Sequence, residues 1–181
     1  MPVRGTGDEQ TKWNLAVRWL PGIPVDRAEL RLTATYAVLP NAFVGVEYNP
    51  LADDVGLLAN WRVIDETLTR PAVMVGTSSD RIGTTSGRAY YVTVAKDLEH
   101  YTGLRAAPYI GTAYGEFDDE WELIGGVGVR WAPGWVSTHS WDGHNLHHML
   151  DRFFDTGRRI GVVVAEQDGK YYTGVSVGMS L

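Results

Sequence analysis

Apolar and polar residues alternate along the stretch 121–131, which reads WELIGGVGVRW. Large apolar residues recur at every second position except Gly125, and the residues between them are small or charged except Ile124. A period of two is typical of a β-strand, because successive side chains point to opposite faces of the sheet. This strand therefore has one apolar face with a Trp at each end, while its other face carries Gly, Glu and Arg.

The same alternation recurs in almost every segment between clusters of Gly, Pro, Asn and Asp, which are typical of turns. The pattern predicts an all-β chain of about twelve strands. We expect them near residues 13–20, 29–39, 42–49, 55–65, 71–79, 88–96, 104–116, 121–132, 134–141, 144–154, 158–167 and 170–181.

One segment, HNLHHMLDRFFDTG (144–157), alternates poorly. It also fits an amphipathic helix with Leu146, Met149, Leu150 and Phe153 on one face. The helical interpretation leaves about ten strands, and the strand interpretation leaves about twelve. We favour twelve.

Two short turns predict the register of their hairpins, because a slip of one residue would put the two apolar faces on opposite sides. With Asp168 and Gly169 as a type I′ turn, Ile160 faces Val177 and Gly161 faces Ser176. With Asp118 and Asp119 as the central turn residues, Tyr114 is expected opposite Leu123. In both hairpins the apolar residues stay on one face.

Trp residues at strand ends favour a membrane barrel. Transmembrane barrel strands of about 9–11 residues turn an apolar face to lipid, with aromatic side chains at both interfaces. The expected interface residues are Trp13, Trp19, Trp61, Trp121 and Trp131. The alternative is a soluble β-barrel that binds an apolar ligand. It would need a second layer to cover the apolar face, because soluble monomers expose only small apolar patches.

The composition of the chain excludes several other classes of protein. The chain has 181 residues, no Cys and a formal net charge of −6, so disulfides and thiolate metal sites are absent and a nucleic-acid partner is not expected. No apolar run approaches 18 residues, and MPVRGTGDEQTK lacks the features of a signal peptide. We expect an N-terminal extension (1–12) before a barrel domain (13–181), and an exported protein would correspond to a mature form.

The stretches VGVEYNP, RPAVMVGTSSDRIG and YYTGVSVGMSL resemble the outer-membrane β-barrel proteins of Gram-negative bacteria, and more loosely the porin-like barrels associated with exopolysaccharide export. Gly174, Val177, Met179 and Leu181 are similar to the C-terminal strand of such proteins, although Leu181 replaces the usual terminal aromatic residue. The resemblance implies an antiparallel up-and-down barrel in the outer membrane, with the lipid bilayer as partner.

The residues that alternate with the outward apolar ones lie on the other face of each strand and should line the lumen. They include more cations than anions, so we expect a passive pore or structural channel component that prefers a small anionic solute such as a sugar acid. The expected lumen residues are Arg18, Arg31, Arg62, Arg130, Arg159, Glu47 and Glu122. The alternative is that these arginines pair with Glu47, Glu122 and backbone carbonyls to fill a narrow barrel. We expect the connections to leave the lumen open, with 78–87 and 96–104 as the long loops, and a bulge at Pro108.

The stretch STHSWDGHNLHH raises two further alternatives. His144 and His148 have the spacing of metal ligands on a helix. Ser137, His139, Ser140 and Asn145 supply the residue types of a lipid hydrolase embedded in the barrel. As a hairpin, the segment instead places His139, His144 and His148 at the rim. We favour a rim role, with no enzyme activity, no metal and no cofactor.

Overall fold

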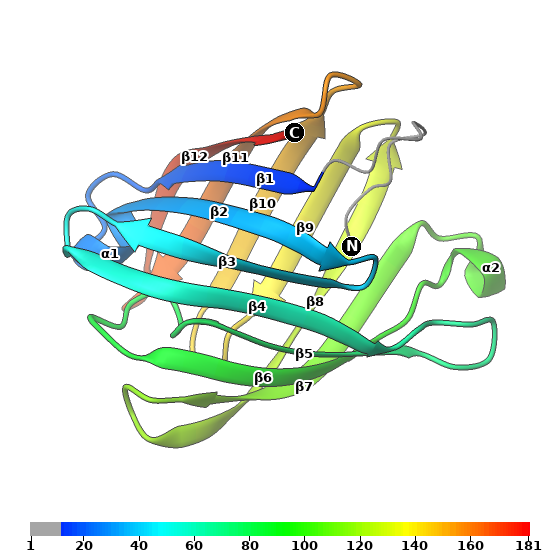
Figure 1. Ribbon diagram of the computed structural model, residues 1–181, viewed down its shortest axis with the longest axis horizontal. Helices are drawn as coiled ribbons and strands as arrows, with labels where there is room; N and C mark the ends of the chain where they lie inside the picture. Colours follow the sequence, from blue (N-terminus) through cyan, green and yellow to red (C-terminus); the bar gives the residue numbers. More distant parts are fainter. Residues whose placement is uncertain (1–11) are drawn as a thin grey trace.

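The computed structural model describes residues 12–181, which form a closed barrel of twelve antiparallel strands (Figure 1). The strands are β1 Trp13–Trp19, β2 Leu30–Leu39, β3 Ala42–Asn49, β4 Asp54–Ile64, β5 Ala72–Ser79, β6 Arg88–Ala95, β7 Ala106–Gly115, β8 Glu120–Ala132, β9 Trp135–Trp141, β10 Leu146–Phe153, β11 Arg158–Gln167 and β12 Lys170–Ser180. Two four-residue helices, α1 Asp26–Glu29 and α2 Glu99–Thr102, lie in connections. Neither helix is long and apolar enough to cross a membrane.

Each strand pairs with its neighbours in sequence, and β1 closes the barrel by pairing with β12. The prediction of an up-and-down barrel of about twelve strands is confirmed. Residues 144–154 contribute strand β10, so the helical interpretation of this segment is wrong. The predicted extension 1–12 lies, apart from Lys12, outside the described residues.

We call the end of the barrel where β1 begins and β12 finishes the terminal end, and the other the opposite end. Connections 40–41, 65–71, 96–105, 133–134 and 154–157 lie at the terminal end, and 20–29, 50–53, 80–87, 116–119, 142–145 and 168–169 at the opposite end. Register shifts occur in three hairpins, between Ala37 and Leu39, Arg62 and Ile64, and Arg130 and Ala132. All three lie toward the terminal end.

The β11–β12 hairpin has the predicted register, with Ile160 opposite Val177 and Gly161 opposite Ser176. Its turn residues Asp168 and Gly169 both have positive φ, as a type I′ turn requires. The predicted register of β7–β8 is wrong by two residues, since Tyr114 faces Trp121 instead of Leu123. The turn has four residues, because only Asp119 adopts positive φ and pairing resumes at Gly115 and Glu120. Because side chains alternate with a period of two, a shift of two residues keeps the apolar side chains of both strands on the same face.

Pro108 does not create the expected bulge. It continues the β7–β8 ladder opposite Val127 without a register shift. On its other side, β6 pairs with β7 only as far as Ala95 and Tyr109, and the backbone N–H of Lys96 donates to the Pro108 carbonyl at 3.1 Å. The proline nitrogen therefore lies beyond the last residue pair of β6, where the ladder requires no N–H.

The barrel is apolar outside and polar inside. Among the described residues, 39 large hydrophobic side chains are exposed, whereas nine hydrophobic residues are buried. The buried polar and charged residues include Glu47, Asp151 and Ser176, all on the inward parity of their strands. Alternation along each strand produces this distribution, because one parity faces out around the whole closed sheet.

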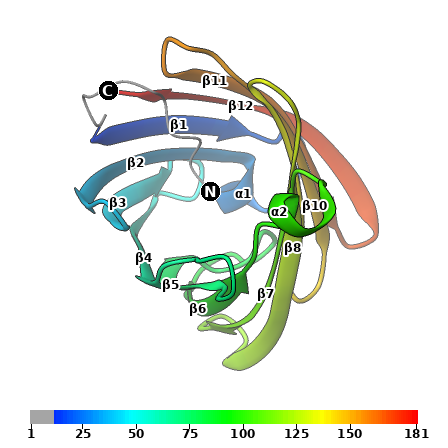
Figure 2. The ribbon, with the colours of Figure 1, turned by 90° about the vertical axis from the view of Figure 1, so that its right-hand side faces the viewer.

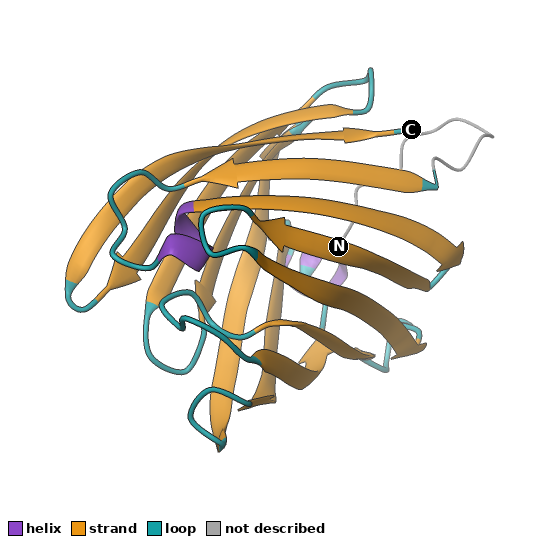
Figure 3. Cartoon of the chain, turned by 60° about the vertical axis from the view of Figure 1, so that its left-hand side comes forward, coloured by secondary structure: helices purple, strands orange, loops and turns teal. Residues whose placement is uncertain are grey.

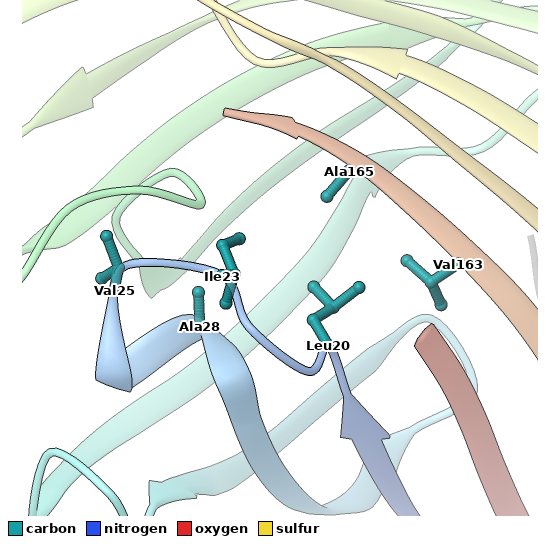
Figure 4. Packing of buried hydrophobic residues seen from close by; sticks show 6 residues of the cluster. All are labelled: Leu20, Ile23, Val25, Ala28, Val163 and Ala165. Atoms are coloured by element: carbon teal, nitrogen blue, oxygen red, sulfur yellow. The ribbon is translucent and has the colours of Figure 1, made fainter. Parts of the chain in front are cut away.

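The connection 20–29 folds into the barrel, so the expectation that no loop enters the lumen is wrong. Figures 2 and 3 show α1 within the ring of strands. Its residues Leu20, Ile23, Val25 and Ala28 are buried with Val163 and Ala165 of β11 (Figure 4). Burial against β11 removes these apolar side chains from water, so the hydrophobic effect holds the connection inside the barrel.

Candidate functional site: the barrel interior and its two rims

The inward arginines are largely paired with carboxylates. Arg159 of β11 forms an ion pair with Asp151 of β10 at 3.0 Å, and Ser176 of β12 donates to the same carboxylate at 3.5 Å. Asp151 is 5% exposed, so the pair is removed from water. Asp151 and Ser176 lie in one inward row on either side of Gly161, and Arg159 lies two residues before Gly161 on the same face of β11.

A second cluster lies on the β1–β3 wall. The Glu47 carboxylate is fully buried and pairs with Arg31. Arg18 of β1 lies opposite Arg31 in the ladder and donates to the Ala28 carbonyl at 3.5 Å. Arg31 alone forms the ion pair with Glu47, and Arg18 contacts the connection 20–29 through the Ala28 carbonyl.

The two remaining predicted arginines lie toward the terminal end. Arg62 pairs with Asp65 at 2.6 Å. Arg130 binds Asp97 at 2.9 Å and Glu99 at 2.7 Å, which ties the α2 connection to β8. Burial alone would raise the pKa of Asp97, but hydrogen bonds from the Glu99 backbone N–H and from Arg130 hold it below its ordinary value.

Arg27 fastens the connection 20–29 to the loop 80–87. Its guanidinium donates to the Gly87 carbonyl at 2.8 Å, to the Asp80 carbonyl at 3.4 Å and to the Thr84 hydroxyl. Arg27 is 5% exposed, and burial lowers its pKa, an effect partly offset by Asp54, Glu47 and Asp80. These bonds join two loops across the opposite end of the barrel and so close part of its mouth.

A cavity of about 190 Å³ remains at the opposite end beside this closure. Its lining carries several carboxylates, namely Asp80, Asp118, Glu120, Glu122 and Asp142, together with Arg81, Tyr91 and Tyr109. Arg81 pairs with Asp118, and the His144 side chain lies 2.8 Å from Glu122. The predicted lumen residue Glu122 therefore belongs to an acidic mouth, on a different part of the wall from the Arg18–Arg31 cluster.

The turn 142–145 is organised by Asp142. Its carboxylate accepts from the backbone N–H groups of His144 and Asn145 at 3.0 and 2.8 Å and lies 2.6 Å from His147 Nε2. Burial acts to raise the pKa of Asp142, but the hydrogen bonds from His147, Asn145 and His144 hold it below its ordinary value. The carboxylate of Asp142 thus stabilises the predicted hairpin at its turn.

His139 and His148 face outward as a cross-strand pair, with their Nδ1 atoms 2.8 Å apart. Ser137 also faces outward, where its hydroxyl accepts the Trp131 indole N–H at 2.9 Å. Ser140 lies on the inward parity and Asn145 in the turn, so the four residue types of the hydrolase alternative are not brought together. Across residues 12–181, no three His, Asp or Glu side chains form a group suited to a metal ion.

Aromatic side chains gather toward the two ends of the outer surface. Trp13, Tyr36, Trp61 and Trp131 lie toward the terminal end, and Trp19, Tyr48, Tyr114 and Trp121 toward the opposite end. Ladder neighbours bring rings together, with centroids 5.0 Å apart for Trp13 and Tyr36 and 5.6 Å apart for Trp121 and Tyr114. All seven Trp residues are exposed, including Trp135 and Trp141, which the sequence interpretation left out of the rims.

Sequence reasoning identified the inward parity and named Glu47, which pairs with Arg31. It also named Glu122, which lies beside His144 instead of an arginine, and it missed the other acidic partners. The inward position of Asp151 follows from the strand interpretation of 144–154, since Asp151 and Met149 lie on the same face of that strand. Asp65, Asp97 and Glu99 lie in connections, where alternation carries no information. A scan against protein-family models gives no match for this chain, and a search of the curated proteins finds no relative.

Proposed function

We propose that the chain is a membrane-spanning β-barrel of the Gram-negative outer membrane that serves as a passive channel component without enzyme activity. One observation carries the proposal. The exposed apolar side chains run around the outside of the closed sheet and end in aromatic residues at both rims. Lipid is the environment that favours an apolar exterior with aromatic side chains at two interfaces.

The soluble alternative accounts less well for this surface. Soluble monomers rarely expose a contiguous apolar patch above a few hundred Å². Here residues such as Leu57, Leu123 and Ile110 are 65%, 62% and 58% exposed on strands β4, β8 and β7. No second sheet within residues 12–181 covers them. The backbone is also suited to lipid, because a closed barrel has no free edge.

The interior supports an occluded channel better than an open pore. Four of the five predicted luminal arginines pair with carboxylates, and the connection 20–29 closes part of the opposite end. Displacement of this connection should therefore widen the path for a solute. The preference for anions stays a prediction, since the Arg18–Arg31 cluster favours it and the acidic mouth opposes it.

Membrane integration is tested by refolding the protein in detergent, mixing it with lipid vesicles and floating the vesicles on a density gradient. We expect the protein to float, to resist extraction at alkaline pH and to run on gels as a heat-modifiable band. A monodisperse protein that stays in the aqueous phase without detergent would overturn the proposal in favour of the soluble barrel.

Channel activity is tested in planar bilayers with the wild type and with Arg27→Ala. Loss of the Arg27 hydrogen bonds leaves the connection 20–29 held by its apolar contacts alone, so the variant should conduct more than the wild type. Arg105→Ala is the matched control, because Arg105 is exposed at the terminal end and pairs only with Glu99 at 3.1 Å among the described residues. Equal conductance in all three proteins would contradict occlusion by this connection. The reversal potential in a salt gradient reports the ion preference.

A further inference from the structure

An apolar groove of about 910 Å³ crosses the outer surface over β11, β12, β1, β2 and β3. The ladder arranges its outward side chains in two rows that cross these five strands. The row nearer the terminal end is Arg158, Met179, Leu15, Ala34 and Val46, and the other is Ile160, Val177, Val17, Leu32 and Tyr48. Four inter-strand steps give the groove a span of about 19 Å.

The side chains of the first row explain why this part of the surface is hollow. Ala34 lies between Leu15 and Val46 in the ladder, so a methyl group separates two larger side chains. Phe154 and Thr156 of the β10–β11 connection add to the lining beyond Arg158. A barrel surface that carries only large aliphatic residues has no such depression, so the small residue creates room for a chain-like apolar group.

Arg158 places a positive charge at the end of this apolar groove. It is exposed and forms no ion pair within residues 12–181, whereas its neighbour Arg159 points inward to Asp151. Another outward arginine on the same rim, Arg152, lies over the Trp135 and Phe154 rings at 5.6 and 5.5 Å. Arg158 can therefore direct its guanidinium to a ligand, and its position at the rim matches the level of lipid headgroups.

We propose that the groove binds one anionic phospholipid, with an acyl chain against the two apolar rows and the phosphate on Arg158. The inference rests on the proposed membrane location. An acyl chain matches an apolar lining that faces lipid, and a phosphate complements the Arg158 guanidinium at its end. A zwitterionic phospholipid would present the same chain but would place an ammonium group near Arg158, so the site should discriminate between headgroups.

Native mass spectrometry of the protein in detergent micelles tests the site, with phosphatidylglycerol and phosphatidylcholine of identical acyl chains. We expect one retained phosphatidylglycerol, bound about tenfold more tightly than phosphatidylcholine. Arg158→Gln should reduce the ratio to within about twofold. Ala34→Phe should weaken both lipids, because the ring fills the groove. Arg70→Gln is the control, since Arg70 is exposed at the same end and donates to the Asp65 carbonyl at 3.2 Å; its ratio should match the wild type.

Flotation with vesicles is measured for each variant in parallel, so that two failures are distinguished. If the protein floats but shows no headgroup preference, or if Arg158→Gln retains the preference, the lipid site is overturned and the membrane location stands. If the wild type does not enter bilayers, the proposed function fails first. A dimer that excludes lipid from the groove would assign this face to contact between two copies and would also overturn the site.

Discussion

At the scale of single residues, the interior is organised by charges that pair across strands. The Glu47 carboxylate is fully buried beside Arg31 and Arg18. One oxygen of Glu47 and the Nε atoms of both arginines make no hydrogen bond within the described structure. This cluster depends on a single negative charge, because no other carboxylate pairs with Arg31 among the described residues.

Glu47→Gln should destabilise the barrel strongly. The amide keeps the shape but removes the charge, which leaves two arginines uncompensated in the interior at a cost of about 3 kcal/mol. Urea unfolding in micelles measures the change. Glu120→Gln is the control, because Glu120 is exposed and forms no ion pair within residues 12–181, so a change within about 0.5 kcal/mol is expected. Equal unfolding midpoints for the two variants would contradict the role of Glu47.

The pKa of Asp142 predicts an acid-sensitive contribution to stability. Its folded-state pKa lies below the ordinary value of 3.8, so the carboxylate stabilises the fold above about pH 4. The contribution is lost as the pH falls through the folded-state pKa. Asp142→Asn should cost about 1.5 kcal/mol at pH 7 and progressively less below pH 4, as measured by urea unfolding at several pH values. A difference between wild type and variant that does not change with pH would contradict this assignment.

At the scale of elements, close approach of strands depends on glycine. A Cβ built on Gly174 of β12 would lie 1.9 Å from the Trp19 carbonyl oxygen of β1, where the barrel closes. The clash involves backbone, which cannot move without disturbing the closing β1–β12 ladder. The side chain of residue 174 is therefore limited by the neighbouring strand and not by φ.

Gly174→Ala should weaken barrel closure, with a loss of about 1–3 kcal/mol. The matched control is Gly128→Ala in β8, where a built Cβ has no heavy atom within 4 Å. This control should be neutral or stabilise by up to about 1 kcal/mol. The temperature at which the heat-modifiable gel band converts to the unfolded form measures both. Equal conversion temperatures would show that β12 yields more readily than its contact with Trp19 implies.

At the scale of the whole molecule, the aromatic residues should report the depth of the barrel in a bilayer. The seven exposed Trp residues lie toward the two ends, so lipids brominated near the headgroup should quench their fluorescence more than lipids brominated at mid-chain. Trp13→Phe and Trp121→Phe remove one ring from each rim and should reduce the quenched signal similarly. Stronger quenching at mid-chain, or no quenching, would contradict the two-belt arrangement.

Alternation in the sequence determined the strands and the two faces of the barrel. A period of two is a local property, so it survives closure and places Trp121, Leu123 and Trp131 outside without any knowledge of distant contacts. The type I′ turn at Asp168 and Gly169 determined a register for the same reason. The four-residue turn before Glu120 escaped prediction because its length depends on which residue adopts positive φ, and adjacent acidic residues do not specify that.

The filling of the barrel interior depends on contacts that form only in the folded protein. The connection 20–29 carries the apolar side chains Leu20, Ile23, Val25 and Ala28, but their burial against Val163 and Ala165 depends on the barrel closing around them. The partners of the inward arginines come from other strands or from loops, as with Asp151 for Arg159 and Asp97 for Arg130. Strand order and register bring these groups together across long separations in sequence. An inward arginine therefore indicates a polar interior, whereas its pairing, and hence the charge that a solute meets, depends on the closed barrel.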